Sequence, residues 1–151
     1  MKKVIEIFRT REELDRLVNL PNRKYKSGVR NRAILSVICY AGLRVSELLN
    51  LKLSDIKAKD HAIMVNNTKK KSSRMVYVPE YLFNYIDKWK EIRSNSKYLF
   101  CSRTGKKLLS DYIQKMVKRY SRKIDPNKDI HPHCFRHYVE CYIMVSETIK
   151  A

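Results

Sequence analysis

The spacing of apolar residues changes along this 151-residue chain, and that change constrains the fold more than any other feature. In most of the chain, apolar residues recur every three or four positions, which predicts amphipathic helices. These helices are predicted at residues 10–20, 33–41, 44–50, 80–89 and 111–124. In the middle, three short runs rich in β-branched residues predict strands at 55–57, 62–66 and 74–78. The sequence therefore predicts one α+β domain, mainly helical, with a small three-stranded antiparallel sheet.

Loops are predicted between these elements. Residues 21–32 are predicted as a loop that carries five basic residues and no acid, and Gly42 is predicted to end the helix at 33–41. Residues 68–73 form a cationic turn between the last two predicted strands. Tyr98–Cys101 is predicted as a buried strand or extended segment, followed by a turn around Gly105.

The charge of the chain predicts the class of its partner. There are 33 lysines and arginines against 15 acids, a formal net charge of +18, although 44% of the residues are hydrophobic. This composition favours a folded domain with a polyanionic partner over a disordered chain. A solvated basic surface that only aids solubility is the alternative. No apolar run reaches the roughly 20 residues of a membrane span, so we expect a soluble, cytoplasmic protein with no membrane partner.

The predicted helix at 111–124 has two distinct faces. Its apolar positions are Ile113, Met116, Val117, Tyr120 and Ile124, and its basic positions are Lys115, Lys118, Arg119, Arg122 and Lys123. Both sets repeat at three and four residues, so one face is predicted to be core and the other a cationic stripe. We expect no acid among these cations, which favours a phosphate-tracking surface over an ordinary solvated face.

The segment 131–137 predicts a second site for a phosphate. Pro132 favours a helix start, and His133, Arg136 and His137 then lie on one face of that helix. The imidazole of His133 beside the guanidinium of Arg136, in a chain this basic, predicts a binding site for a phosphate.

The cysteines and histidines could instead hold a metal. The four cysteines show no C-x-x-C spacing, and we expect Cys39 and Cys101 to be buried free thiols. A zinc site is the alternative for five residues near the end of the chain: His131, His133, Cys134, His137 and Cys141. No matching ligand pair lies elsewhere and Arg136 would sit beside the cation, so we expect neither a metal nor any other cofactor.

Three segments resemble motifs of the tyrosine recombinases, the phage-integrase and Xer-like family. Ala41–Leu51 (AGLRVSELLNL) is similar to the first family motif, and Thr68–Pro79 to its lysine-bearing β-turn segment. His133–His137 (HCFRH) resembles the H-x-L-R-H box, with Phe135 in the usual leucine position. The three occur in family order over nearly the whole chain. The resemblance implies the catalytic-domain fold of this family and the cleavage and rejoining of DNA through a 3′-phosphotyrosine.

The resemblance also implies roles for individual residues. Arg44 and Arg136 would bind the scissile phosphate, and His133 would handle a proton near the attacking tyrosine. Lys69, or one of its neighbours Lys70 and Lys71, would protonate the departing 5′-oxygen. Two further residues would hold the site in place without touching the phosphate themselves: Glu47 and His137.

The remaining expectations concern DNA and the ends of the chain. The expected phosphate contacts are Arg23, Lys24, Lys26, Lys70, Lys71, Arg74, Lys115, Lys118, Arg119, Arg122 and Lys123. The family's N-terminal domain and its nucleophile segment are expected to be absent from residues 1–151. Tyr138 and Tyr142 are expected to be core residues.

The expected partners are duplex DNA and other recombinase subunits, with no small-molecule substrate. The expected behaviour is DNA binding without cleavage by this chain alone, and the alternative is a non-enzymatic DNA-binding module or regulator.

Overall fold

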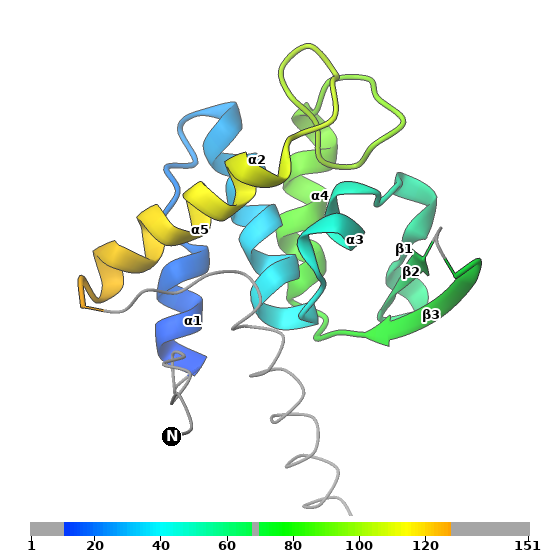
Figure 1. Ribbon diagram of the computed structural model, residues 1–151, viewed down its shortest axis with the longest axis horizontal. Coiled ribbons are helices and arrows are strands. Elements are labelled where there is room, and N and C mark those ends of the chain that lie inside the picture. Colours follow the sequence, from blue (N-terminus) through cyan, green and yellow to red (C-terminus); the bar gives the residue numbers. More distant parts are fainter. Residues whose placement is uncertain (1–10, 68–69, 128–151) are drawn as a thin grey trace, which may run out of the picture.

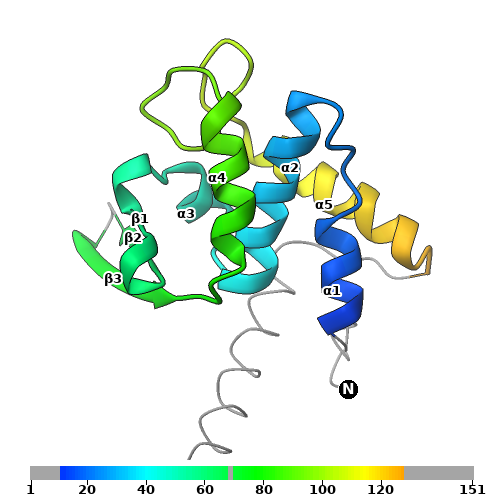
Figure 2. The same cartoon turned by 180° about the vertical axis from the view of Figure 1, so that it is seen from behind.

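Helix α2 (Lys26–Ser36) lies at the centre of the molecule, between α4 (Leu82–Ile92) on one face and α5 (Ser110–Ile124) on the other (Figures 1 and 2). The computed structural model describes residues 11–67 and 70–127. Helix α1 (Arg11–Val18) packs beside α2 and α5, and its Leu14, Leu17 and Val18 are buried, as the apolar spacing predicts.

The start of α2 was predicted wrongly. The segment 21–32 is predicted to be a loop, but the helix begins at Lys26. The prediction fails because Arg30 and Asn31, whose polar side chains suggest an exposed loop, face the interior. Arg30 donates to the hydroxyl of Tyr112 in α5 at 2.6 Å and to the carbonyl of Cys101 at 3.3 Å. These bonds satisfy a charge that would otherwise be costly to bury.

A glycine allows the preceding loop to pack against α2. A Cβ atom at Gly28 would lie 1.7 Å from the carbonyl oxygen of Asn22, which is far inside van der Waals contact. Only a residue without a side chain permits this approach.

The second half of the central helix changes its winding. Val37–Ala41 forms a π-helical turn, and Gly42 then ends the helix in the left-handed conformation at φ 67°, as predicted. All five residues of the turn are buried. Cys39 is among them, and it and Cys101 are buried free cysteines, which confirms that expectation.

The predicted three-stranded antiparallel sheet is confirmed. Strands β1 (Ile56–Lys57), β2 (Ala62–Asn67) and β3 (Ser72–Tyr77) pair in the order β1-β2-β3. In the β2–β3 register, Val65 lies opposite Arg74. Strand β1 is shorter than predicted because Asp55 belongs to a 3₁₀ turn (Leu53–Asp55), where its carboxylate accepts the N–H of Lys52 at 2.9 Å.

The segment between α4 and α5 is held by side chains instead of a strand ladder. Leu99, Phe100 and Cys101 are buried as predicted. The backbone forms one isolated bridge, between Cys101 and Lys107, and the N–H of Leu99 donates to the carbonyl of Leu51 at 2.8 Å. Arg93 donates to the carbonyls of Ser96, Tyr98 and Leu99 at 2.8, 2.6 and 3.3 Å. The guanidinium therefore supplies hydrogen bonds that a second strand would otherwise provide.

Helix α5 buries Ile113, Met116 and Val117 in the shared core, which confirms the predicted apolar face. The helix predicted after Pro132 lies outside the described residues. Among the helices that are described, none combines the length and the apolar character needed to cross a membrane.

Candidate nucleic-acid interface

Arg44 is presented at the start of helix α3 (Val45–Leu49). The left-handed turn at Gly42 and the buried Leu43 bring the chain back to the surface, where Arg44 is extended (φ −68°, ψ 152°) and exposed. Its backbone N–H donates to Oε1 of Glu47 at 2.9 Å, which caps the first turn of the helix. Its guanidinium makes no hydrogen bond or ion pair with the described residues.

Glu47 binds a different arginine through its carboxylate. Nη1 of Arg74 lies 2.6 Å from Oε2 of Glu47, and Nη2 lies 3.2 Å from Oε1. The Glu47 side chain is 9% exposed and that of Arg74 is 45% exposed. The hydrogen bond to Glu47 raises the pKa of Arg74 above its ordinary value. Strand β3 is thus fixed to the start of α3, and the acid that the spacing would pair with Arg44 is engaged elsewhere.

The turn between β2 and β3 presents lysines at the edge of this site. Lys70 and Lys71 are exposed, and Lys71 adopts a left-handed conformation at φ 48°. The strands beneath are connected by side chains: Ser73 donates to Asn66 at 2.7 Å, and Asn66 donates to the buried Asp55 at 3.1 Å. A lysine turn on a cross-linked hairpin can meet an anion with little loss of backbone freedom.

The basic face of α5 is exposed along its whole length, as predicted: Lys115, Lys118, Arg119, Arg122 and Lys123. The expectation that no acid lies among them is wrong at one end. Lys115 pairs with Asp111, one turn earlier, at 2.9 Å. Both groups are well exposed, so this pair contributes little to stability. Arg119 and Lys123 lie 5.0 and 5.4 Å from the ring centre of Tyr120, which stabilises two cations near one another.

The cations before and within α2 divide into two groups. Arg23, Lys24 and Lys26 are exposed. Arg30 is buried, and Arg32 binds the carbonyls of Pro21 and Asn19 at 2.7 and 2.8 Å.

Comparison with known proteins places the chain in a family. Residues 8–149 match the model described as the phage integrase family. The chain belongs to the phage integrase family. It is 36% identical over 141 residues to the tyrosine recombinase XerA of Thermococcus kodakarensis, covering 89% of this chain and 48% of that protein. This phage-integrase chain therefore spans about half the length of such relatives.

Solved structures agree with this assignment. A crystal structure of XerA recombinase matches with a TM-score of 0.80 and 26% identity, over 95% of this chain and 51% of that one. The pre-cleavage complex of the XerH recombinase bound to its difH substrate matches with a TM-score of 0.76 and 21% identity, over 89% of this chain and 41% of that one. The fold is that of the tyrosine-recombinase catalytic domain.

Four predicted site residues, Lys69, His133, Arg136 and His137, lie outside the described residues. The predicted approach of Arg44 to His133 and Arg136 therefore stays a prediction, as do the core positions of Tyr138 and Tyr142. Within the part of the integrase that the structure describes, no three His, Cys, Asp or Glu side chains form a metal-binding group.

The sequence did not reveal the bond between Glu47 and Arg74. The two residues are 27 positions apart and belong to a helix and a strand, so no local spacing signals their contact. The guanidinium of Arg74 binds Glu47 and its side chain is 45% exposed, so its contact with DNA stays a prediction.

Proposed function

We propose that this phage-integrase domain binds duplex DNA across the surface formed by the start of α3, the β2–β3 turn and the basic face of α5, with Arg44 on the scissile phosphate. The observation that carries the proposal is the engagement of Glu47 by Arg74. Because that carboxylate does not pair with the Arg44 guanidinium, Arg44 remains available to an anion at the surface.

The chemistry of strand cleavage explains why an unpaired guanidinium is useful. Attack on a phosphodiester builds negative charge on the non-bridging oxygens, and a guanidinium can meet that charge with two parallel hydrogen bonds. Arg136 would supply the second guanidinium and His133 would move the proton of the nucleophile. A lysine of the turn, Lys69 or its neighbours Lys70 and Lys71, would protonate the leaving oxygen.

The cations of α5 would hold the flanking duplex. Lys118, Arg119, Arg122 and Lys123 follow one face over more than one helical turn, a spacing suited to successive phosphates. Lys24, Lys26 and Lys115 would add weaker contacts. The similar XerH structure is bound to its difH substrate, which supports duplex DNA as the partner.

We also infer that the polypeptide of residues 1–151 binds DNA without cleaving it. The tyrosines after the His133–His137 box, Tyr138 and Tyr142, fall on the side of that predicted helix away from His133 and Arg136. Without a nucleophile at the phosphate, no covalent intermediate can form. A tyrosine from a second chain would be needed.

A pool of nicked duplexes of random sequence tests both parts. The protein is incubated with the labelled pool, and bound DNA is separated on native gels and on denaturing gels. We expect a retarded complex on the native gel and no covalent adduct on the denaturing gel. A covalent protein–DNA adduct would refute the inference about cleavage, and the absence of any retarded complex at low salt would refute DNA binding.

A further inference from the structure

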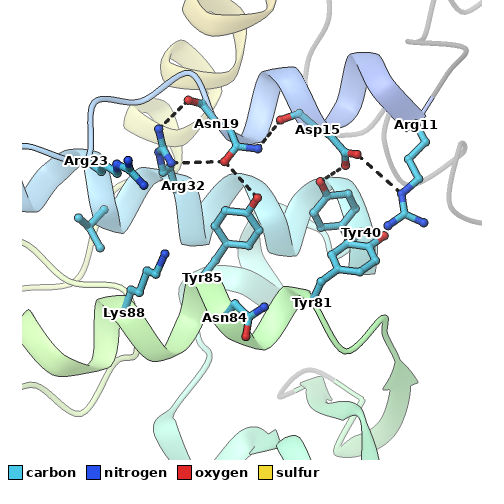
Figure 3. A pocket seen from close by; sticks show the side chains of 11 residues that line it. Arg11, Asp15, Asn19, Arg23, Arg32, Tyr40, Tyr81, Asn84, Tyr85 and Lys88 are labelled. Carbon is cyan, nitrogen blue, oxygen red and sulfur yellow. Dashed lines mark hydrogen bonds and ion pairs between the residues drawn. The ribbon is translucent and has the colours of Figure 1, made fainter.

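A groove lies between α1 and α4 (Figure 3), and these two helices are on the face of the molecule turned away from α5 (Figure 2). Its volume is about 540 Å³, and α2 and the π-helical turn form its floor. Its lining combines four cations with three tyrosines: Arg11, Arg23, Arg32, Lys88, Tyr40, Tyr81 and Tyr85. This mixture differs from the plain cationic stripe of α5 and suits a ligand with both charged and apolar groups.

One end of the groove concentrates positive charge. Arg23 comes from the loop before α2, Arg32 from α2 in the floor, and Lys88 from the α4 wall (Figure 3). Arg32 is held in place by the carbonyls of Pro21 and Asn19. Burial, followed by the nearby charge of Arg23, lowers the pKa of Arg32 below its ordinary value. Three cations lie at this end without an acid among the described lining residues there, so an anion would relieve their repulsion.

The other end of the groove is aromatic and electrically balanced. Asp15 is the only acid among the described residues that line the groove, and its carboxylate accepts a bond from the hydroxyl of Tyr40. Arg11 lies 3.8 Å from the same carboxylate and 4.2 Å above the ring of Tyr81. The rings of Tyr40 and Tyr81 pack edge to face, 4.9 Å apart. This end therefore offers aromatic surface and no free charge of either sign to a ligand.

The dimensions of the groove suit a short chain. Lys88 lies seven positions after Tyr81, the residue that precedes α4, and this is roughly 10 Å of helix or about three residues of extended peptide. Tyr85 lies between the two ends, and its hydroxyl donates to Asn19 at 3.1 Å. A single inorganic anion would fill only the cationic end.

We propose that this groove binds an acidic peptide segment of a partner protein, with carboxylates at Arg23, Arg32 and Lys88 and an apolar side chain on Tyr81 and Tyr85. Duplex DNA fits the groove less well, because a phosphate backbone has no apolar group to place on the tyrosines. The groove also faces away from the α5 surface. The proposal does not depend on whether the domain cleaves DNA.

The test uses the full 151-residue chain and an array of short fluorescent peptides built from glutamate, aspartate and leucine. Each peptide is paired with an isomer in which glutamine and asparagine replace the acids. The key variant is Lys88→Glu. Its matched control is Lys90→Glu, which makes the same charge change two residues later, at an exposed position on α4 outside the groove lining. A labelled random duplex is titrated in parallel, and circular dichroism confirms that both variants fold.

We expect several acidic peptides to bind with micromolar dissociation constants and their amide isomers to bind at least about tenfold more weakly. Lys88→Glu should weaken peptide binding about tenfold relative to Lys90→Glu, while the two variants bind the duplex equally. Three results would overturn the proposal. The first is no acidic peptide bound at concentrations up to about 1 mM. The second is an equal loss in both variants. The third is a duplex affinity that falls with Lys88→Glu alone, which would assign the groove to DNA.

Discussion

Glu47 binds Arg74 through both carboxylate oxygens, at 2.6 and 3.2 Å, and so keeps its charge away from the guanidinium of Arg44. The same carboxylate accepts the backbone N–H of Arg44 at 2.9 Å. Glu47 therefore fixes the backbone of Arg44, which we place on the phosphate. The counterion of the Glu47 carboxylate is Arg74, from strand β3. This division explains why an Arg and a Glu three positions apart do not neutralise each other here.

Removing Arg74 should destabilise the domain. Arg74→Ala leaves the largely buried carboxylate of Glu47 without its cation, and we expect a loss of about 1–3 kcal/mol in the free energy of unfolding. Arg74→Lys keeps the charge but only one of the two bonds, so its loss should be smaller. Urea unfolding measures both. An Arg74→Ala variant as stable as the parent would contradict the assigned role of the ion pair.

Removing the Arg44 side chain should affect binding but not stability. Its guanidinium has no partner among the described residues, so Arg44→Ala should change the free energy of unfolding by less than about 0.5 kcal/mol. DNA affinity should fall about tenfold at low salt, as expected for one lost charged contact. Fluorescence anisotropy with a labelled duplex gives the affinity. Loss of stability without loss of affinity would make Arg44 a structural residue.

The α5 surface should dominate the salt dependence of DNA binding. Replacing Lys118, Arg119, Arg122 and Lys123 by glutamine should lower the slope of log affinity against log salt by roughly 3 to 4. Lys115→Gln should have a smaller effect, since Lys115 already pairs with Asp111. The control is the pair of changes Lys88→Gln and Lys90→Gln at two exposed positions of α4. An equal change in slope for each charge removed in the control would show that binding depends only on net charge.

The buried Tyr40 should make stability depend on pH in alkaline solution. Burial, followed by the hydrogen bond to Asp15, raises the pKa of Tyr40 above its ordinary value. Because the folded-state pKa is raised, the contribution of Tyr40 is complete below pH about 10 and is lost as the pH rises further. Tyr40→Phe should cost about 1–2 kcal/mol near neutral pH, and the difference from the parent should shrink above pH about 10. Denaturant unfolding at several pH values measures it. A constant difference would argue against this environment for Tyr40.

Gly28 should not tolerate a side chain. A Cβ atom there would meet the carbonyl oxygen of Asn22 at 1.7 Å, so Gly28→Ala must displace the loop before α2. We expect a loss of about 1–3 kcal/mol, the usual cost of overpacking, in thermal or urea unfolding. Ser27→Ala, at the exposed neighbouring position, serves as the control and should be close to neutral.

Much of the fold could be predicted from local patterns. The helices at 45–49, 82–92 and 110–124 follow from spacings of three to four residues, and the three strands follow from short runs rich in β-branched residues. The first turns of α2 could not be predicted in this way, because they contain buried polar residues and show no regular spacing of apolar ones. The burial of Arg30 depends on Tyr112, which is 82 positions away in the sequence. The availability of Arg44 depends in the same way on a strand distant in sequence.

Arg30, Arg32 and Arg93 contribute to the formal charge of the chain, but each of them is bonded within the molecule. Their guanidiniums bind main-chain carbonyls of Cys101, of Pro21 and Asn19, and of Ser96, Tyr98 and Leu99. They hold irregular backbone in place through hydrogen bonds, so part of the +18 formal charge also serves the architecture of the molecule. Lysine carries the same charge but lacks the planar fork of donors, so at these three positions it could not replace arginine.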